Sequence, residues 1–371
     1  MDPKPPLIGY SRGPVSRISL RGQTTPQWLD ARVRITTLAG GIGGARFLRG
    51  LRHHVQRAAN DSVQRETNGT EITVIGNTGD DIWIHGLRVC PDLDTVMYTL
   101  GEGIDPERGW GRLDETFRAK EELTAYGVEP TWFGLGDRDI GTHLVRTTSL
   151  NAGYPLSRVT EALCERWQPG VHLIPMTDDR AETHVIVDDP DNPGTDIALH
   201  FQEWWIRYRA SLPARRFVIV GIEEATPAPG VVDALRNADV ILLPPSNPIV
   251  SIGTILAVPG LADEIRAAKA PVVGVSPIIS GAPVRGMADA CLRASGIETT
   301  AAAVAQHYGA RPSGGLLDGW LVDTSDAAST PDIEEVGITA RAVPLLMTDL
   351  DATAAMAAET LDLASRLRST P

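Results

Sequence analysis

Residues 35–47 join a hydrophobic segment to four glycines and then to the start of a helical pattern, in the order Ile-Thr-Thr-Leu-Ala-Gly-Gly-Ile-Gly-Gly-Ala-Arg-Phe. Glycine lets backbone N–H groups approach a ligand closely, and the N-terminus of a helix carries partial positive charge. The segment therefore predicts a strand–loop–helix junction that binds a phosphate-bearing ligand. Two familiar motifs do not fit. Arg46 replaces the third glycine of the dinucleotide fingerprint, and no Gly-Lys-Ser/Thr follows Gly40 at the P-loop spacing. A turn that binds nothing is the alternative interpretation.

The composition narrows the class of protein and of partner. A chain of 371 residues is long enough for one large α/β domain or two smaller ones. Its formal net charge of −13 argues against a broad nucleic-acid-binding surface, so small molecules are the expected partners. The three cysteines form no Cys-x-x-Cys motif, and the apolar runs are shorter than the roughly 20 residues that span a bilayer. We therefore expect a cytoplasmic protein without a membrane span, a zinc site or a disulfide framework.

Short apolar segments alternate with amphipathic segments from Val33 onward. This alternation favours an α/β fold with a doubly wound, mostly parallel, Rossmann-like sheet. The expected strands are residues 33–39, 72–76, 216–221, 239–243 and 271–275. The expected helices are residues 44–56, 113–126, 142–152, 157–167, 228–237, 250–257 and 284–294.

The chain also divides by composition. Residues 1–32 are rich in Pro, Gly, Ser and Arg without periodicity, which predicts a disordered N-terminal extension. The folded domain is expected to occupy residues 33–371, with a polar surface loop at 57–70. Residues 112–210 carry mainly helical patterns and a β-ribbon pattern at 182–200, so we interpret them as a subdomain inserted between the two halves of the sheet.

Acidic residues follow the second expected strand, at the edge where ligands bind in open α/β sheets. Asp80 and Asp81 come directly after this strand, and Asp92 and Asp94 follow a short distance on. Carboxylates that face a phosphate loop repel the ligand unless a cation lies between them, and Mg²⁺ takes one or two carboxylates together with phosphate oxygens. We expect Asp80 and Asp94 to be the Mg²⁺ ligands. Asp92 is expected to cap the following helix, and Asp81 to point to solvent.

Polar residues also follow the later strands. Ser246 and Asn247 come after one of them and Ser276 after the next, where hydroxyl and amide groups are suited to a phosphate or a nucleobase edge. An Asn-Pro turn with a serine cap is the simpler interpretation. Arg138 can bind a phosphate or a planar ligand, or it belongs to an ordinary salt-bridged turn.

The stretch His200-Phe201-Gln202-Glu203-Trp204-Trp205 gathers aromatic residues in a chain of which only 5% is aromatic. Two interpretations are open. The rings wall a site for a ring-containing ligand, or they belong to the core or to a subunit interface. The second interpretation favours a homodimer, since symmetric dimers are the commonest assemblies.

Taken together, these segments resemble the CofD/FbiA family, the transferases that act on the deazaflavin Fo in coenzyme F-420 biosynthesis. The resemblance extends over residues 33–371 and is closer to the actinobacterial FbiA type than to archaeal relatives. It rests on motifs at residues 38–47, 79–83, 91–95, 136–139, 200–205, 245–248 and 276–279.

The resemblance implies a reaction at phosphorus. The terminal ribityl hydroxyl of Fo attacks a guanosine diphosphate that carries enolpyruvate or lactate, and GMP leaves. It also implies that Mg²⁺ lies on Asp80 and Asp94, that Asp94 orients or deprotonates the hydroxyl, and that Arg138 and His143 face Fo. The residues implied to hold the nucleotide are Gly40, Gly41, Gly43, Gly44, Arg46, Ser246, Asn247 and Ser276.

Two other functions stay open at this point. A non-enzymatic regulatory protein that binds nucleotide sugars shares the glycine-rich start and the Ser-Asn strand end, whereas Asp80, Asp94 and the aromatic segment favour an enzyme. A dinucleotide-dependent oxidoreductase is less favoured, because it needs an acidic residue where this chain has Asn77. The residue types leave the transferred unit undecided between enolpyruvyl and lactyl. We expect Asp94→Asn to abolish transfer while the fold stays intact.

Overall fold

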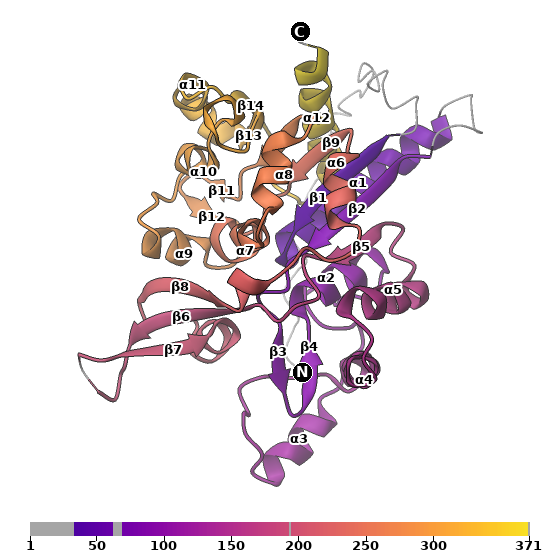
Figure 1. Cartoon of the computed structure of the whole chain (residues 1–371), viewed down its shortest axis with the longest axis vertical. Coiled ribbons are helices and arrows are strands. Elements are labelled where there is room, and N and C mark those ends of the chain that lie inside the picture. The colour runs from indigo at the N-terminus through magenta and orange to yellow at the C-terminus, as the bar shows by residue number, and fades with distance from the viewer. Residues whose placement is uncertain (1–32, 62–68, 193, 370–371) are drawn as a thin grey trace, which may run out of the picture.

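The computed structural model describes residues 33–61, 69–192 and 194–369, so the predicted extension at 1–32 lies outside the described residues. The centre of the fold is a seven-stranded parallel sheet with the strand order β14-β13-β10-β9-β1-β2-β5 (Figure 1). Its strands are β1 (Arg34–Ala39), β2 (Glu71–Gly76), β5 (His172–Pro175), β9 (Val240–Leu243), β10 (Val272–Val275), β13 (Gly319–Asp323) and β14 (Thr339–Val343). The chain adds strands on one side of β1 and later on the other, which confirms the predicted doubly wound α/β fold.

Helices cover both faces of this sheet, and each face has its own hydrophobic core. In β1, Ile35 packs into one core and Leu38 into the other, and at most 1% of either side chain is exposed. The first core includes α1 (Gly41–Asp61), α2 (Pro91–Leu100), α5 (Leu156–Trp167) and α12 (Leu350–Ser369). The second includes α6 (Val231–Arg236), α7 (Gly253–Ala257), α8 (Leu261–Ala267), α9 (Ala288–Ala294), α10 (Ala301–Tyr308) and α11 (Thr330–Glu335).

Two further groups of elements lie beyond the carboxyl edge of the central sheet, toward the bottom of Figure 1. A small antiparallel sheet in the order β7-β6-β8 projects on one side, and a hairpin with two helices lies on the other. The small sheet consists of β6 (Glu182–Asp188), β7 (Asp196–His200) and β8 (Ala214–Val220). The other group consists of β3 (Ile82–Ile84), β4 (Leu87–Val89), α3 (Arg118–Ala125) and α4 (Asp137–Asn151). A short β11 (Ile278–Ile279) and β12 (Ala282–Pro283) follow β10.

Several predicted elements are confirmed and others are corrected. The β-ribbon expected at 182–200 is the β6–β7 hairpin. The strand expected at 216–221 forms β8, which pairs antiparallel with β6 and not within the parallel sheet. Its side chains alternate between half-buried and exposed, the pattern of a strand with one face in solvent, whereas β9 is buried throughout.

Helix boundaries differ in a similar way. The helix expected at 44–56 begins at Gly41 and runs to Asp61, so residues 57–61 of the expected loop are helical, and residues 62–68 lie outside the described residues. The helix expected at 113–126 is shortened to α3. The segment interpreted as an inserted subdomain, 112–210, also supplies β5 to the central sheet.

Candidate active site

A pocket of about 1090 Å³ lies at the carboxyl edge of the central sheet, where the strand order reverses between β1 and β9. Gly40 follows β1, Asp80 follows β2, Ser246 follows β9 and Ser276 follows β10, and all four line it. This is the place where open α/β sheets bind their ligands. The structure therefore brings together residues that the sequence places more than two hundred positions apart.

The glycine-rich junction packs closely against neighbouring elements. A Cβ atom on Gly40 would lie 2.6 Å from Asp92 Oδ2, and one on Gly43 would lie 2.1 Å from the Pro245 carbonyl oxygen. Gly41 has a φ of +66°, which favours glycine. Gly40, Gly41 and Gly43 line the pocket at the N-terminus of α1, and Gly44 is buried behind them against Ser246. Because these glycines have no side chains, the N-terminus of α1 can lie directly at the pocket wall.

This packing gives a stability prediction. Because the Pro245 oxygen is backbone, Gly43→Ala forces α1 away from the end of β9 and should lower the free energy of unfolding by about 1–3 kcal/mol. Gly141→Ala, within α4, is the matched control because its Cβ atom meets nothing within 4 Å. It should leave stability unchanged or raise it by up to about 1 kcal/mol. Urea unfolding of the three proteins measures both effects, and equal loss in the two variants would contradict the packing argument.

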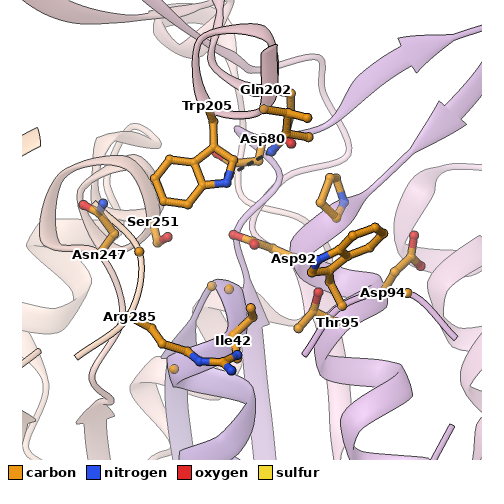
Figure 2. Close-up of a pocket in the computed structure, with 18 of the residues that line it drawn as sticks. Ile42, Asp80, Asp92, Asp94, Thr95, Gln202, Trp205, Asn247, Ser251 and Arg285 are labelled. Atoms are coloured by element: carbon orange, nitrogen blue, oxygen red, sulfur yellow. Dashed lines mark hydrogen bonds between the residues drawn. The ribbon is translucent and has the colours of Figure 1, made fainter. Parts of the chain in front are cut away.

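Two buried carboxylates share one amide at the centre of the pocket wall. The Asn77 Nδ2 group donates to Asp92 Oδ2 at 2.9 Å and to Asp80 Oδ1 at 3.4 Å. Gln202 Nε2 donates to Asp80 Oδ2 at 3.4 Å (Figure 2). Asp80 is 6% exposed and Asp92 5% exposed. Burial raises the pKa of Asp80 well above its usual value, and the neighbouring Asp92 and Asp81 raise it further. Burial also raises the pKa of Asp92 to about 6, although hydrogen bonds from Asn77 and Gly41 act in the opposite direction.

These shifts predict a pH-dependent stability in the presence of EDTA. A carboxyl with a raised pKa in the folded state stabilises the protein most below its unfolded pKa, and this contribution is lost as the pH rises through the folded value, about 6 for Asp92. Asp92→Asn cannot ionise, so its melting temperature should exceed that of the wild type at about pH 7, and the difference should shrink toward pH 4. Asp233→Asn, at an exposed position on α6, should differ little from the wild type at either pH. A difference for Asp92→Asn that is independent of pH would contradict the assignment.

Asp94 has a different environment from Asp80, although both were expected to bind the same cation. The Arg146 guanidinium donates to both Asp94 oxygens, with Nη1 at 3.0 Å from Oδ2 and Nη2 on Oδ1. Arg146 is 1% exposed and lies on α4 behind the pocket wall. Burial lowers the pKa of Arg146, but the charge and hydrogen bonds of Asp94, together with Cys90 and Tyr98, raise it above its usual value. Asp94 therefore faces the pocket with its charge already compensated by a protein cation.

A polar chain continues from this ion pair along α4. Arg146 Nη1 lies 3.1 Å from His143 Nδ1, and His143 Nε2 lies 3.6 Å from Asp139 Oδ2. The Tyr98 hydroxyl donates to Asp139 Oδ1 at 2.5 Å. Burial raises the pKa of Asp139, but His143, the hydrogen bond from Tyr98 and the charge of Arg146 together lower it below its usual value. Tyr98, Asp139 and His143 line the pocket, so they form an anchored polar wall next to Asp94.

Other predicted residues are placed as follows. Ser246, Asn247 and Ser276 line the pocket, as does Arg46 on α1. Asn247 also accepts hydrogen bonds from the backbone N–H groups of residues 249 and 250, so it caps the π-helical turn Pro248–Ile252. Arg138 is exposed, donates to the Leu113 carbonyl oxygen at 3.0 Å and does not line the pocket.

Two expectations about acidic residues are wrong. Asp92 does not cap α2, because Cys90 occupies the N-cap position and the Asp92 side chain lies in the first turn, hydrogen-bonded to Asn77. Asp81 does not point to solvent. It is fully buried and pairs with Arg88 at 3.1 Å, and burial raises its pKa to about 6 although Arg88 opposes the shift. Arg88 also pairs with Glu182 at 3.2 Å, which ties the loop after β2 to the small sheet.

Aromatic side chains line much of the pocket, and sequence reasoning did not find most of them. The ring residues are Tyr98, Trp110, Phe117, Trp132, Phe133, Phe201 and Trp205. Trp110, Phe117, Trp132 and Phe133 come from one stretch of the chain, and we call them the aromatic chamber. Arg108 lies 5.2 Å from the centre of the Trp110 ring and 5.5 Å from that of Phe117, so it holds the two rings together. Each interpretation of the tryptophan pair holds for one residue. Trp204 is fully buried in the core, whereas Trp205 lines the pocket.

Comparisons with known proteins decide the family. Residues 35–355 match the family model described as 2-phospho-L-lactate transferase CofD. The chain belongs to the CofD family. Relatives named phosphoenolpyruvate transferase are similar to it over most of their length. The protein of Streptomyces griseus subsp. griseus is 64% identical over 91% of this chain and 100% of its own. That of Nocardia farcinica is 59% identical over 89% and 95%, and that of Mycobacterium avium 58% identical over 90% and 99%.

These matches confirm the predicted resemblance and its actinobacterial type, and they support a transferase of coenzyme F-420 biosynthesis. Two solved structures of protein BH3568 from Bacillus halodurans share the fold with a TM-score of 0.56 at 17% identity, covering 88% of this chain and 98% of that one. In the described parts of the CofD-family chain, no single helix is long and apolar enough to cross a membrane, although the bent pair Pro248–Ala257 and Leu261–Ala267 together pass that test.

Proposed function

We propose that this protein transfers a phosphoenolpyruvyl group from an enolpyruvyl diphosphoguanosine to the terminal ribityl hydroxyl of Fo, releasing GMP and forming dehydro-F-420-0. One observation carries the proposal. A single pocket joins a glycine-rich helix N-terminus and two buried carboxylates to an aromatic chamber. The first part suits a diphosphate with a cation, and the second suits a planar deazaflavin ring. The names of the relatives favour the enolpyruvyl donor over the lactyl donor.

The chemistry of the acidic pair fits Mg²⁺. Asp80 and Asp92 are buried carboxylates with only amide partners among the interactions described above, and a cation would compensate their charge. Within the described residues no group of three or more His, Cys, Asp or Glu could hold a metal, so the other ligands would be phosphate oxygens and water. Such a mixed ligand set is typical of Mg²⁺. When bound, the ion would supply charge neutralisation at the diphosphate.

We assign Asp80 and Asp92 to the cation and Asp94 to the acceptor. The sequence also indicates Asp94 as a cation ligand, but both its oxygens accept hydrogen bonds from Arg146. A carboxylate held in this way has fixed orientation and can accept a hydrogen bond from the acceptor hydroxyl. In phosphoryl transfer, positioning and charge stabilisation contribute more than a covalent nucleophile. The hydroxyl oxygen then forms the new bond to phosphorus, the phosphorus–oxygen bond to GMP breaks, and the hydroxyl proton is released.

Fo is proposed to lie in the aromatic chamber. Trp110, Phe117, Trp132 and Phe133 offer ring faces, and His143 with Asp139 offers polar atoms nearer to Asp94. In this proposal the flat ring would lie among aromatic side chains and the polar ribityl chain would run along α4. Arg138, expected to face Fo, lies apart from the pocket, so we give it no part in this proposal.

A mass-spectrometric assay tests the proposal. Purified protein is incubated with Fo, Mg²⁺ and either the enolpyruvyl or the lactyl diphosphoguanosine, each in a separate reaction. The proposal predicts the mass of dehydro-F-420-0 with the enolpyruvyl donor and a much slower reaction with the lactyl donor. Nucleotide binding without product from either donor would instead support the regulatory-protein alternative.

A further inference from the structure

Two arginines flank the first turns of α1 at the pocket wall. Arg46 lies on α1 and Arg285 on the segment after β12, and both line the pocket. A Cβ atom on Gly109 would lie 2.6 Å from Arg285 Nη1 and 3.4 Å from Ile42 Cδ1, so Arg285 and Ile42 lie side by side beneath this loop. Figure 2 shows the Arg285 side chain extending toward α1 beside Ile42.

Within the described part of the chain, neither Arg46 nor Arg285 forms an ion pair or a side-chain hydrogen bond. This contrasts with Arg88 and Arg146, which are both paired with carboxylates. Burial lowers the pKa of Arg46, and the positive charges of Arg285 and Arg49 lower it further. Two guanidinium groups that repel each other at a pocket wall are most stable with an anion between them.

The pocket wall is acidic on one side of Ile42 and basic on the other. Figure 2 shows Asp92 on one side of Ile42 and Arg285 on the other. The acidic side suits phosphates that carry a cation, whereas the basic side suits an anionic group that binds without one. Guanidinium groups bind both carboxylates and phosphates through paired hydrogen bonds.

We propose that Arg46 and Arg285 form a clamp for an anionic oxygen group of the donor that is not bound by the cation. This inference rests on the proposed function and deepens it. The donor offers two such groups, the carboxylate of the transferred unit and the phosphate farther from the cation. The clamp makes donor recognition depend on Arg285, which lies outside all the motifs that identify the family from sequence.

Equilibrium binding tests the clamp without requiring turnover. The probes are GDP, phosphoenolpyruvate and inorganic pyrophosphate, each with Mg²⁺, and the proteins are the wild type, Arg46→Gln and Arg285→Gln. Loss of a charge-assisted hydrogen bond should weaken binding about tenfold or more for at least one probe. Arg285→Lys should recover only part of the loss, because it restores the charge but not the paired donors.

Arg49→Gln is the matched control. It removes the same charge from α1, is exposed and does not line the pocket, so each probe should bind within about twofold of the wild-type affinity. Melting temperatures exclude misfolding as the cause of any loss.

The pattern of losses identifies the clamped group. Weaker binding of phosphoenolpyruvate alone would assign it to the carboxylate, and weaker binding of GDP and pyrophosphate would assign it to a phosphate. If the wild type bound pyrophosphate and phosphoenolpyruvate but not GDP, with the same dependence on the two arginines, the clamp would stand and the guanosine donor would fail. Binding of all probes by both Gln variants within about twofold of the wild type, or no binding by the wild type, would overturn the clamp.

Discussion

Asp94→Asn is expected to reduce transfer by at least about 100-fold and to lower the free energy of unfolding by about 3–5 kcal/mol. The second effect follows because the substitution leaves the Arg146 guanidinium buried without its anionic partner. The sequence alone predicts an intact fold for this variant, since a site carboxylate contributes little to a core. The structure adds a stability cost to that expectation, because the carboxylate belongs to a buried ion pair.

Chemical denaturation and initial rates at low temperature measure the two effects separately. The double variant Asp94→Asn/Arg146→Met is the control, because it removes both charges of the pair. It should recover much of the lost stability without recovering transfer. A single Asp94→Asn variant as stable as the wild type would show that the ion pair contributes little, and wild-type rates would exclude Asp94 from the reaction.

Asp80→Asn is expected to have the opposite effect on stability. Asp80→Asn should reduce transfer by at least about 100-fold, because it removes a proposed cation ligand. In EDTA it should raise the stability of the protein by roughly 1 kcal/mol, because it removes the repulsion between two buried carboxylates. Asn77 can still donate to the oxygen of the new amide, and Gln202, which donates to the other carboxylate oxygen, can turn its side-chain amide so that its oxygen accepts from the new NH2 group.

Asp80→Asn and Asp94→Asn therefore make the same Asp-to-Asn change at an uncompensated carboxylate and at a paired one. Thermal unfolding in EDTA should place Asp80→Asn above the wild type and Asp94→Asn below it. Millimolar Mg²⁺ with GDP should stabilise the wild type by mass action but stabilise Asp80→Asn much less. A lower melting temperature for Asp80→Asn in EDTA would contradict the view that its carboxylate is uncompensated in the protein alone.

The parallel sheet and the glycine-rich loop are predictable from sequence because they depend on local patterns. Buried β-branched runs identify β1, β9 and β10, and the glycines mark the turn that follows β1. The close approach of Gly43 to Pro245, in contrast, joins distant parts of the chain and leaves no local signal. The strand β8 has the composition of a sheet strand, but only its tertiary partner β6 decides which sheet it joins.

In the candidate site, too, local patterns identify some residues, and tertiary contacts decide the roles of others. Asp80 and Asp94 look equivalent in the sequence, and Arg146 on α4 makes them different. A signal for Arg146 was present, since it follows His143 by three positions on an expected helix and so lies on the same face. Asp92 resembles a helix cap because it stands near the start of a helical pattern, and only the position of Asn77 shows that it faces the pocket. The aromatic chamber is assembled from residues outside the helices and strands, where periodicity gives no guide.

Transfer to Fo is tested by quantifying GMP and the Fo-derived product in one reaction, with and without Fo. We expect equal molar amounts of GMP and dehydro-F-420-0 with the enolpyruvyl donor, and no GMP when Fo is omitted. Release of GDP in place of GMP, or GMP formation without Fo, would contradict transfer of the phosphoenolpyruvyl group to the Fo hydroxyl.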